Sequence, residues 1–322
     1  MRIFFSFPTL PIDSVGRYYG RLTYTGRFPN MIQGSIVALV TPFLESGDVD
    51  FDALQRLVDF HVDAGTHGIV SVGTTGESAT LSHDEDAQVI AATVEYAAGR
   101  IPVIAGAGSN ATAEACQLTE AATRAGADAI LSVAPYYNKP PQRGLIAHFK
   151  AVAAATDLPV ILYNVPGRTV TDIADETTLE LAETANIVGI KDATGDLKRA
   201  QFLLANRPDG FRVYSGDDPT AMELCLFGGD GDISVTANVA PRLMSQMIEA
   251  AMAGDREGAQ ALNQQLLGLH AALFAEPNPI PSKWALAQMG LMRPDCRLPL
   301  VDLTESGMAQ VRDACLQAGI AL

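Results

Sequence analysis

Short apolar runs alternate with amphipathic stretches along most of this chain. The apolar runs are rich in Val, Ile and Leu and are bounded by turn residues, which is typical of strands buried on both faces of a parallel sheet. They predict strands at 34–40, 68–72, 101–106, 128–133, 158–163, 187–192, 211–215 and 231–235. Apolar residues recur at helical spacing after each run. This second pattern predicts helices at 51–64, 82–98, 112–125, 142–156, 174–183, 197–206, 219–227 and 241–253.

Regular alternation of strands and helices predicts a (β/α)8 barrel, also called a TIM barrel, over residues 31–254. An open doubly wound sheet is the alternative. That fold would place a GxGxxG turn after the first strand, and the residues found there, VTPF (40–43), lack the motif. After the barrel, helical patterns at 257–274, 282–289 and 304–318 predict a small all-helical C-terminal domain spanning 255–322.

Residues 1–30 differ in composition from the rest of the chain. They carry four arginines against one acid, and they are rich in aromatic residues and interrupted by prolines. A signal peptide is disfavoured because the prolines break the apolar patch and no small-residue cleavage site follows it. An arginine-rich transit peptide is a further alternative. We expect a poorly ordered N-terminal extension, with Met31 as an alternative start.

Charge and composition exclude several classes of function. The 322 residues carry a net charge of −15, which disfavours binding to nucleic acid or to an anionic membrane. No apolar run approaches the roughly 18 residues that a membrane span needs. The four cysteines are scattered, as expected for reduced thiols in the cytosol, and the five histidines lack metal-binding spacing. We therefore predict a cytoplasmic protein with no metal and no cofactor.

The run Ile187–Ile190 leads directly into Lys191 and Asp192. Side chains alternate between the two faces of a strand, so Asp192 points away if Lys191 points into the barrel. A desolvated lysine favours its neutral amine, and its pKa falls from about 10.4 towards 7. A neutral amine attacks a carbonyl and forms a Schiff base. The plainer alternative is a lysine that leaves the end of the strand for solvent.

Further candidate groups stand where other predicted strands end, and barrel enzymes place their chemistry at these ends. The turn GTTGE (73–77) offers hydroxyls and backbone N–H groups for a carboxylate. Tyr163 ends a strand and could carry protons, whereas Arg168 suits a bidentate grip on a carboxylate. Asp217 and Asp218 would repel a phosphate, which argues for a substrate without one. Together these residues predict a site that activates the carbonyl of a keto acid.

The motifs resemble those of the 4-hydroxy-tetrahydrodipicolinate synthase (dihydrodipicolinate synthase) family. These enzymes belong to the pyruvate-dependent class I aldolases, which include N-acetylneuraminate lyase. The matching motifs cover nearly the whole barrel and reach into the C-terminal region. They are GSIVALVTPF (34–43), GTTGESATL (73–81), PYYNKP (135–140), YNVPGRT (163–169), GIKDATGD (189–196), YSGDD (214–218), ISVTANVAP (233–241) and EPNPIPSKWAL (276–286).

The resemblance implies a lyase of the diaminopimelate route to lysine that condenses pyruvate with L-aspartate 4-semialdehyde. Lys191 would form the Schiff base with pyruvate, and Tyr163 would shuttle protons. Thr74 would connect Tyr163 to Tyr137 of a neighbouring subunit. The implied substrate-binding residues are Thr75 for the pyruvate carboxylate, Arg168 for the carboxylate of the semialdehyde, and the backbones of Gly216 and Ile233 as pocket lining.

The resemblance also implies a homotetramer built as a dimer of dimers, because the family shares Tyr137 across an interface. Some members bind lysine at that interface as an inhibitor. The matching positions here are Ser78, His83, Asn110, Glu114 and Tyr136. Asp86 stands where sensitive forms carry histidine or glutamate, and it keeps a negative charge on a shorter side chain. Lysine inhibition is therefore a hypothesis.

Two other functions remain as alternatives. A sister aldolase would act on a hydroxylated or sugar-derived aldehyde through the same imine, although Arg168 and the turn 73–77 favour the synthase. A barrel without catalysis could bind a keto acid as a sensor or a scaffold. The presence of the full set Thr74, Tyr137, Tyr163, Arg168 and Lys191 argues against it.

Overall fold

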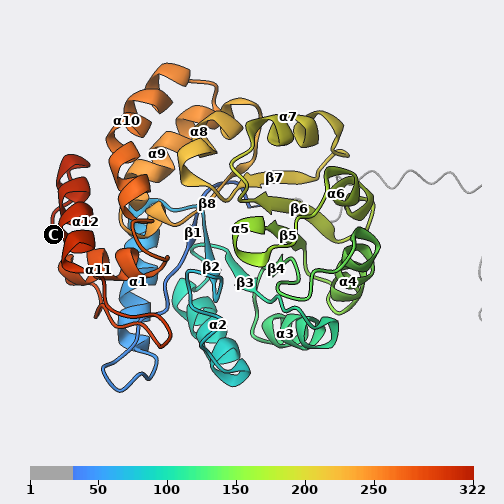
Figure 1. Cartoon of the computed structure of the whole chain (residues 1–322), viewed down its shortest axis with the longest axis horizontal. Helices are drawn as coiled ribbons and strands as arrows, with labels where there is room; N and C mark the ends of the chain where they lie inside the picture. The colour runs from blue at the N-terminus through green and yellow to red at the C-terminus, as the bar shows by residue number, and fades with distance from the viewer. Residues whose placement is uncertain (1–31) are drawn as a thin grey trace, which may run out of the picture.

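The computed structural model describes residues 32–322, so the expectations for residues 1–30 lie outside it. Eight parallel strands follow one another in chain order, and β1 pairs with β8 to close a barrel (Figure 1). The strands are β1 Gly34–Ala38, β2 Gly68–Ser71, β3 Val103–Gly106, β4 Ala129–Val133, β5 Val160–Asn164, β6 Ile187–Asp192, β7 Arg212–Ser215 and β8 Gly231–Ser234. The predicted barrel is confirmed, and closure rules out the open doubly wound sheet.

A ring of helices surrounds the barrel (Figure 1). Its members are α1 Phe51–Ala64, α2 His83–Ala97, α3 Thr112–Arg124, α4 Gln142–Ala154, α6 Asp175–Ala182, α7 Leu197–Asn206, α8 Asp218–Leu226 and α9 Pro241–Met252. Local signals set several helix starts. A capping box begins α2, with Ser82 and Glu85 each bonding the other's backbone N–H.

Two differences from the predicted elements have local causes. The third strand begins at Val103 and not at residue 101, because Pro102 has no N–H to donate to a ladder. A short helix, α5 Pro166–Thr169, forms within the predicted loop after β5, and Pro166 at its first turn favours that start.

Apolar residues form two layers, one inside the barrel and one between the strands and the helices. Strand β6 feeds both layers, but not by strict alternation. Val188 points into the barrel, where it joins Tyr163 and Ile233, whereas Ile187 and Ile190 pack outward against the helices. The pairing register with β5 shifts between Ile187 and Gly189, so Val188 is an extra residue on β6. Beyond this irregularity Lys191 pairs with Tyr163 and shares its inward face, although alternation counted from Val188 would have placed Lys191 on the outer face.

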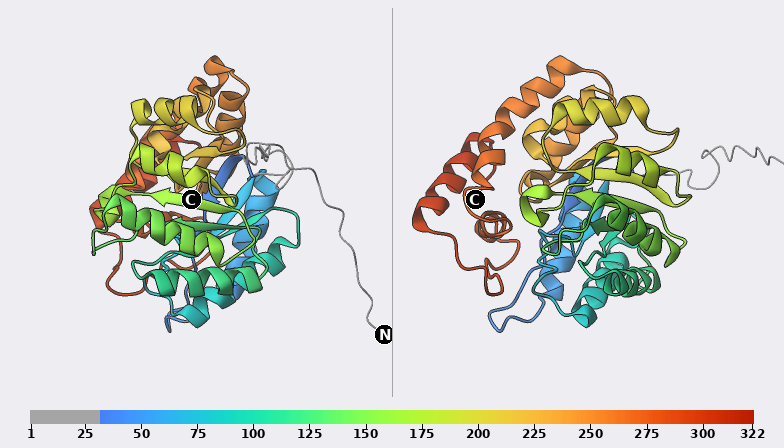
Figure 2. Two further views of the ribbon diagram at one scale, coloured as in Figure 1. Left: turned by 90° about the vertical axis from the view of Figure 1, so that its right-hand side faces the viewer. Right: turned by 45° about the vertical axis from the view of Figure 1, so that its right-hand side comes forward.

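Three helices continue the chain along one flank of the barrel: α10 Arg256–Ala272, α11 Ile280–Gln288 and α12 Glu305–Gln317 (Figure 2). All three helices expected at the C-terminus are present. Helix α10 packs on α9 and α8 of the barrel as well as on α12. The division into domains at residue 254 therefore stays a prediction.

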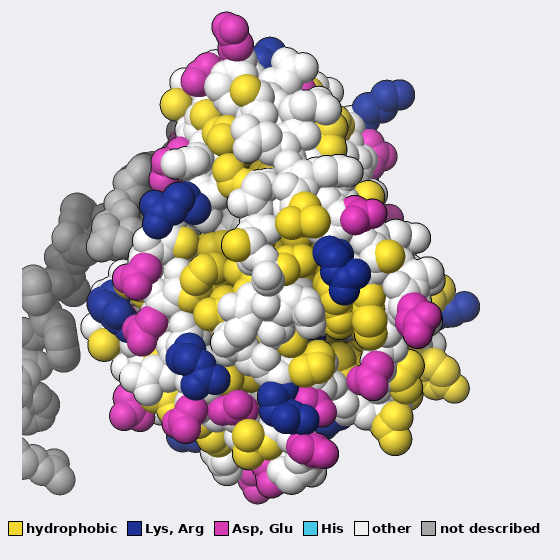
Figure 3. Space-filling view, turned by 90° about the vertical axis from the view of Figure 1, so that its left-hand side faces the viewer, with side chains coloured by type: hydrophobic (Ala, Val, Ile, Leu, Met, Phe, Trp, Pro, Cys, Tyr) yellow, Lys and Arg dark blue, Asp and Glu magenta, His cyan; other side chains and the backbone are white. Residues whose placement is uncertain are grey.

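Figure 3 shows the face that these helices present, where acidic and basic side chains mix around scattered apolar ones. Lys and Arg appear there as separated side chains and form no basic stripe. None of the helices in residues 32–322 combines the length and the apolar character that crossing a membrane requires.

Candidate active site

Lys191 lies inside the barrel mouth beside Tyr163. The two residues occupy matching positions on the neighbouring strands β6 and β5, so their side chains share the inward face. Lys191 is 5% exposed, and its Nζ lies 4.4 Å from the centroid of the Tyr163 ring. The negative face of the ring would stabilise the protonated form of this amine, so the contact positions the lysine and does not make it neutral. The alternative of a lysine in bulk solvent is wrong.

Lys191 is one of two buried lysines, and their surroundings differ. Lys283 forms an ion pair with Glu77, and both side chains are inaccessible to solvent. Lys191 has no carboxylate within 4.0 Å in residues 32–322. Asp192 points to the opposite face and pairs with Arg199, with 2.6 Å between Oδ2 and Nε. Only Lys191 is thus left without a counter-ion at the barrel mouth, as a nucleophilic amine requires. Its neutral state stays a prediction.

Gly216 follows β7 and lies against the side chain of Lys191. A Cβ at position 216 would stand 2.6 Å from Cε of Lys191, so only glycine leaves room for the lysine in this position. Ile233 lies on the inward face of β8 in the same apolar layer as Tyr163. Both residues thus surround the base of the predicted site.

The turn after β2 carries Thr74 and Thr75. Thr75 is 3% exposed, and its Oγ1 accepts a hydrogen bond from Nδ2 of Asn278 at 2.9 Å. Thr75 acts as an acceptor in this bond and still has its own hydroxyl proton, which it can donate to a carboxylate. Arg168 lies at the mouth, where its Nη2 donates to the carbonyl of Asn278 at 3.4 Å. Asn278 therefore connects both groups that are expected to bind carboxylates.

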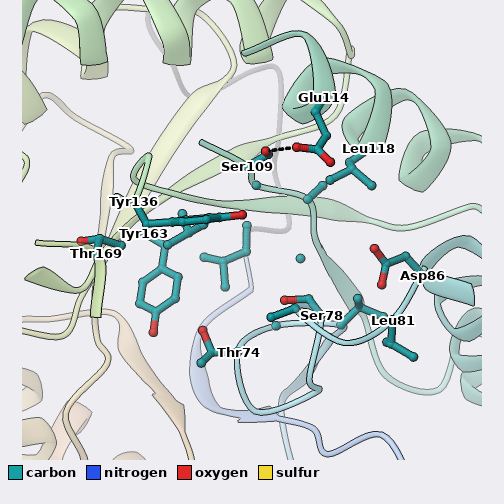
Figure 4. A pocket seen from close by; sticks show the side chains of 18 of the residues that line it. Thr74, Ser78, Leu81, Asp86, Ser109, Glu114, Leu118, Tyr136, Tyr163 and Thr169 are labelled. Carbon is teal, nitrogen blue, oxygen red and sulfur yellow. Dashed lines mark hydrogen bonds between the residues drawn. The ribbon is translucent and has the colours of Figure 1, made fainter. Parts of the chain in front are cut away.

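A cavity of about 380 Å³ opens at this end of the barrel (Figure 4). Thr74, Tyr163 and Arg168 line one part of it. Figure 4 shows the hydroxyl groups of Thr74 and Tyr163 on the same side of the cavity. Lys191, Thr75, Gly216 and Ile233 are not among its lining residues. Of the predicted catalytic and carboxylate-binding residues, all except Tyr137 thus lie in or around one barrel mouth.

The other part of the cavity is acidic. Its lining includes Ser78, His83, Glu114 and Tyr136 from the predicted lysine site, together with Asp86. Glu114 accepts a hydrogen bond from Ser109 (Figure 4) and pairs with His83, whose Nε2 lies 2.8 Å from Oε1. Burial, with a further contribution from the charge of Glu85, raises the pKa of Asp86 to about 7. Asn110 is not among the lining residues.

Comparison with known proteins identifies the relatives of the chain. Residues 31–318 match the model of the dihydrodipicolinate synthetase family. A 4-hydroxy-tetrahydrodipicolinate synthase of Laribacter hongkongensis is 57% identical over 290 residues, which are 90% of this chain and all of the relative. The chain belongs to this family. The expected family is confirmed, and so is the expected enzyme, a synthase of the aldolase type.

Solved structures agree with the family assignment. A chloride-inhibited dihydrodipicolinate synthase of Acinetobacter baumannii, complexed with pyruvate, has a TM-score of 0.89 and 54% identity over 90% of this chain and all of that one. A family structure from Cyanidioschyzon merolae with lysine bound has a TM-score of 0.86 and 41% identity over 89% of this chain and 98% of that one.

Tyr137 is set apart from the other predicted catalytic residues. Its side chain is 87% exposed, and its backbone φ of 72° lies in the left-handed region that non-glycine residues rarely adopt. An apolar ring held out in water by a strained backbone is typical of a group with a binding partner. Within one copy of the chain, Tyr137 is not among the residues that line the cavity.

The sequence analysis missed the residues that hold the turn 73–77 in place. Glu77 has a φ of 57°, and its buried carboxylate accepts hydrogen bonds from Lys283 and from the backbone N–H of Arg297. Asn278 fixes Thr75 from the same C-terminal region. Asn278 and Lys283 both lie in the motif EPNPIPSKWAL, but nothing in the sequence indicated that they contact a turn about 200 residues earlier.

Proposed function

We propose that this member of the family condenses pyruvate with L-aspartate 4-semialdehyde through a Schiff base on Lys191. The observation that carries the proposal is the amine of Lys191, buried in the barrel mouth without a carboxylate partner and lying against the ring of Tyr163. An amine in this setting suits imine formation with a small keto acid. The free hydroxyl proton of Thr75 and the guanidinium of Arg168 supply two separate carboxylate sites, as two carboxylate substrates need.

The reaction divides into steps that these residues can perform. The Lys191 amine attacks the carbonyl carbon of pyruvate, and Tyr163 gives its phenol proton to the departing hydroxyl group, which leaves as water as the imine forms. The resulting phenolate of Tyr163 then takes a proton from the methyl group, and the enamine carbon attacks the aldehyde, whose oxygen takes that proton back from Tyr163. The amino group of the semialdehyde finally adds to the imine carbon, which closes the ring and releases Lys191. Thr74 positions Tyr163 for proton transfer.

Substrate comparison tests the function directly. We expect turnover with pyruvate and L-aspartate 4-semialdehyde, and no cleavage of N-acetylneuraminate above background. Arg168 matches the carboxylate of the semialdehyde, whereas a sugar-acid lyase would need hydrogen-bonding groups for several hydroxyls at this position. Product formation would be followed by absorbance with each substrate at equal enzyme concentration. Cleavage of the sugar acid together with no turnover of the semialdehyde would establish the sister aldolase instead.

The proposal includes self-association as a homotetramer, with Tyr137 entering the site of a neighbouring copy. The exposed ring of Tyr137 supports this part. Co-expression of Lys191→Met with Tyr137→Phe, under two affinity tags, provides the test. In a mixed dimer, one of the two sites has both Lys191 and the Tyr137 of its neighbour. About half of the randomly paired dimers are mixed, so roughly one quarter of wild-type activity should return from two nearly inactive variants. Activity that stays at the level of the separate variants in the doubly tagged complex would show that Tyr137 acts within its own chain.

Lysine binding in the acidic part of the cavity is the regulatory part of the proposal. Asp86 has a pKa of about 7, so it gains its negative charge as the pH rises from 6 to 8. Lysine carries two ammonium groups, and its affinity should therefore increase over this interval. Calorimetric titration at both pH values measures the change, and Asp86→Asn should remove most of the increase. Absence of lysine uptake at roughly millimolar concentration would reject the site.

A further inference from the structure

A buried polar cluster lies behind β8, on the side of the strand that faces the helices. It contains Asp232 on β8, Asp218 at the start of α8, Thr236 in the short helix η2 (Thr236–Asn238) and His270 on α10. Each of the four residues is at most 3% exposed. Two carboxyl groups out of contact with water are costly to ionise together, because burial and their mutual repulsion both oppose the second charge.

The hydrogen bonds of the cluster satisfy one oxygen of Asp218 completely. Its Oδ2 accepts from the N–H groups of Val235 at 3.1 Å and Thr236 at 2.9 Å, and from the hydroxyl of Thr236 at 3.0 Å. The same hydroxyl lies 2.8 Å from Nδ1 of His270. Because Thr236 donates its only hydroxyl proton to Asp218, it must accept from Nδ1–H of His270. This arrangement holds Asp218 as a carboxylate.

The remaining oxygens of the two acids have no such donors. Oδ1 of Asp218 and both oxygens of Asp232 are buried and have no hydrogen bond of good geometry in the described chain when both groups are written as carboxylates, although the hydroxyl of Ser234 also approaches Asp218. A single proton on Asp232 removes one of the two charges and joins one oxygen of Asp232 to Oδ1 of Asp218, which leaves one neutral carbonyl oxygen of Asp232 without a donor.

We propose that Asp232 is a protonated acid in the folded enzyme and donates its hydrogen bond to Asp218, so that the pair carries one negative charge. The pair ties the start of α8 to the residues after β8, because Asp218 accepts from the N–H groups of Val235 and Thr236. The inference goes beyond the proposed function, since it holds whichever aldehyde the enzyme uses.

The charged and titratable surroundings favour this state. Burial, then the charge and hydrogen bond of Asp218, raises the pKa of Asp232 well above its usual range, and Lys191 on β6 opposes this only in part. Burial alone would raise the pKa of Asp218. The nearby His270 on α10 and the hydrogen bonds that Asp218 accepts lower the pKa of Asp218 overall. Two other groups face the pair. The charge of Asp217 also raises the pKa of Asp232, and the buried thiol of Cys225 lies on α8.

The shared proton has a defined effect on stability. In the unfolded chain Asp232 loses its proton near its ordinary pKa of about 4, whereas in the folded chain it keeps the proton to higher pH. The unfolded state is therefore favoured increasingly as the pH rises between these two values. Over this pH interval Asp232 alone should increase the unfolding equilibrium constant about tenfold per pH unit. Asp232→Asn, which keeps a neutral donor towards Asp218, should remove that contribution.

Infrared spectroscopy of the intact enzyme tests the proposal. At pH 7 Asp86 is only partly ionised, so the spectra are compared in the Asp86→Asn background, which should still show the carbonyl stretch of a protonated carboxylic acid. Asp232→Asn should remove the band, whereas Asp209→Asn, the same change at an exposed site, should retain it. Denaturant titrations from pH 5 to 8 should show Asp232→Asn gaining stability over wild type as the pH rises.

Two results would contradict the proposal that Asp232 and Asp218 share one proton. The first is an Asp86→Asn spectrum without the acid band, and the second is a band that persists unchanged when Asp232→Asn is added to a folded protein. If Asp232→Asn does not fold, the double variant Asp86→Asn/Asp175→Asn decides, because it removes the two other carboxyl groups whose pKa is raised. In that case a band that survives in the double variant supports the proposal, and a band that disappears contradicts it.

Discussion

Replacement of Lys191 by methionine is expected to lower kcat by at least about 10⁴-fold, because the covalent intermediate can no longer form. Methionine keeps the length and the apolar stem of the side chain, so the barrel should remain packed. The buried site also loses an amine without a carboxylate partner, and the thermal midpoint should therefore not fall. Steady-state kinetics and thermal unfolding of the same preparation would measure both quantities.

Lys150→Met is the matched control for this change. Lys150 lies on α4 and forms an exposed ion pair with Glu180, with 3.2 Å between Nζ and Oε1. Removing such a pair costs little stability and should leave kcat within about twofold of wild type. Activity of Lys191→Met at a tenth or more of the wild-type level would show that Lys191 does not carry the chemistry.

Replacement of Tyr163 by phenylalanine is expected to lower kcat by roughly 10²–10³-fold, the usual contribution of one positioned proton carrier. The ring remains beside Lys191, so the imine with pyruvate should still form, whereas proton removal from the methyl group should become slow. Exchange of the pyruvate methyl protons with deuterated water, followed by NMR, isolates that step.

Tyr96→Phe provides the control for the loss of a phenol hydroxyl, because Tyr96 lies on α2 away from the barrel mouth. It should exchange the methyl protons at the wild-type rate. If Tyr163→Phe also exchanged them at that rate, the proton carrier would have to be another group.

Local sequence signals predicted most of the fold. The apolar run before Lys191 was sufficient to place a strand there, and alternation predicted that Lys191 and Asp192 would face opposite sides. The contact between Lys191 and Tyr163 needed one further step, namely that both residues stand near the carboxyl ends of adjacent barrel strands. Regular βα repetition supplied that step.

Contacts between distant parts of the chain were not predictable in this way. The hydrogen bond from Asn278 to Thr75 joins residues 203 positions apart, and the Lys283–Glu77 pair spans 206. No periodicity specifies how the C-terminal helices dock on a turn of the barrel. Asp232 was hidden for another reason. In the sequence it is one polar residue within a predicted strand. Its proposed protonation follows only from Asp218 and His270, which come from other elements of the fold.

Lys283 offers the sharpest comparison with Lys191. Both lysines are buried, and burial lowers the pKa of Lys283, although Glu77 opposes the shift. The Glu77 carboxylate and the carbonyl of Asp295 accept hydrogen bonds from the Lys283 ammonium. These partners favour its charged, unreactive form, whereas no carboxylate in residues 32–322 lies within 4.0 Å of the Lys191 amine.

The most direct test of the Schiff base is reduction with borohydride in the presence of pyruvate, followed by peptide mapping. The account predicts one adduct per chain, on the peptide that contains Lys191, and no adduct in Lys191→Met. An adduct on Lys283 or on any other lysine, or no adduct on the active enzyme, would contradict it.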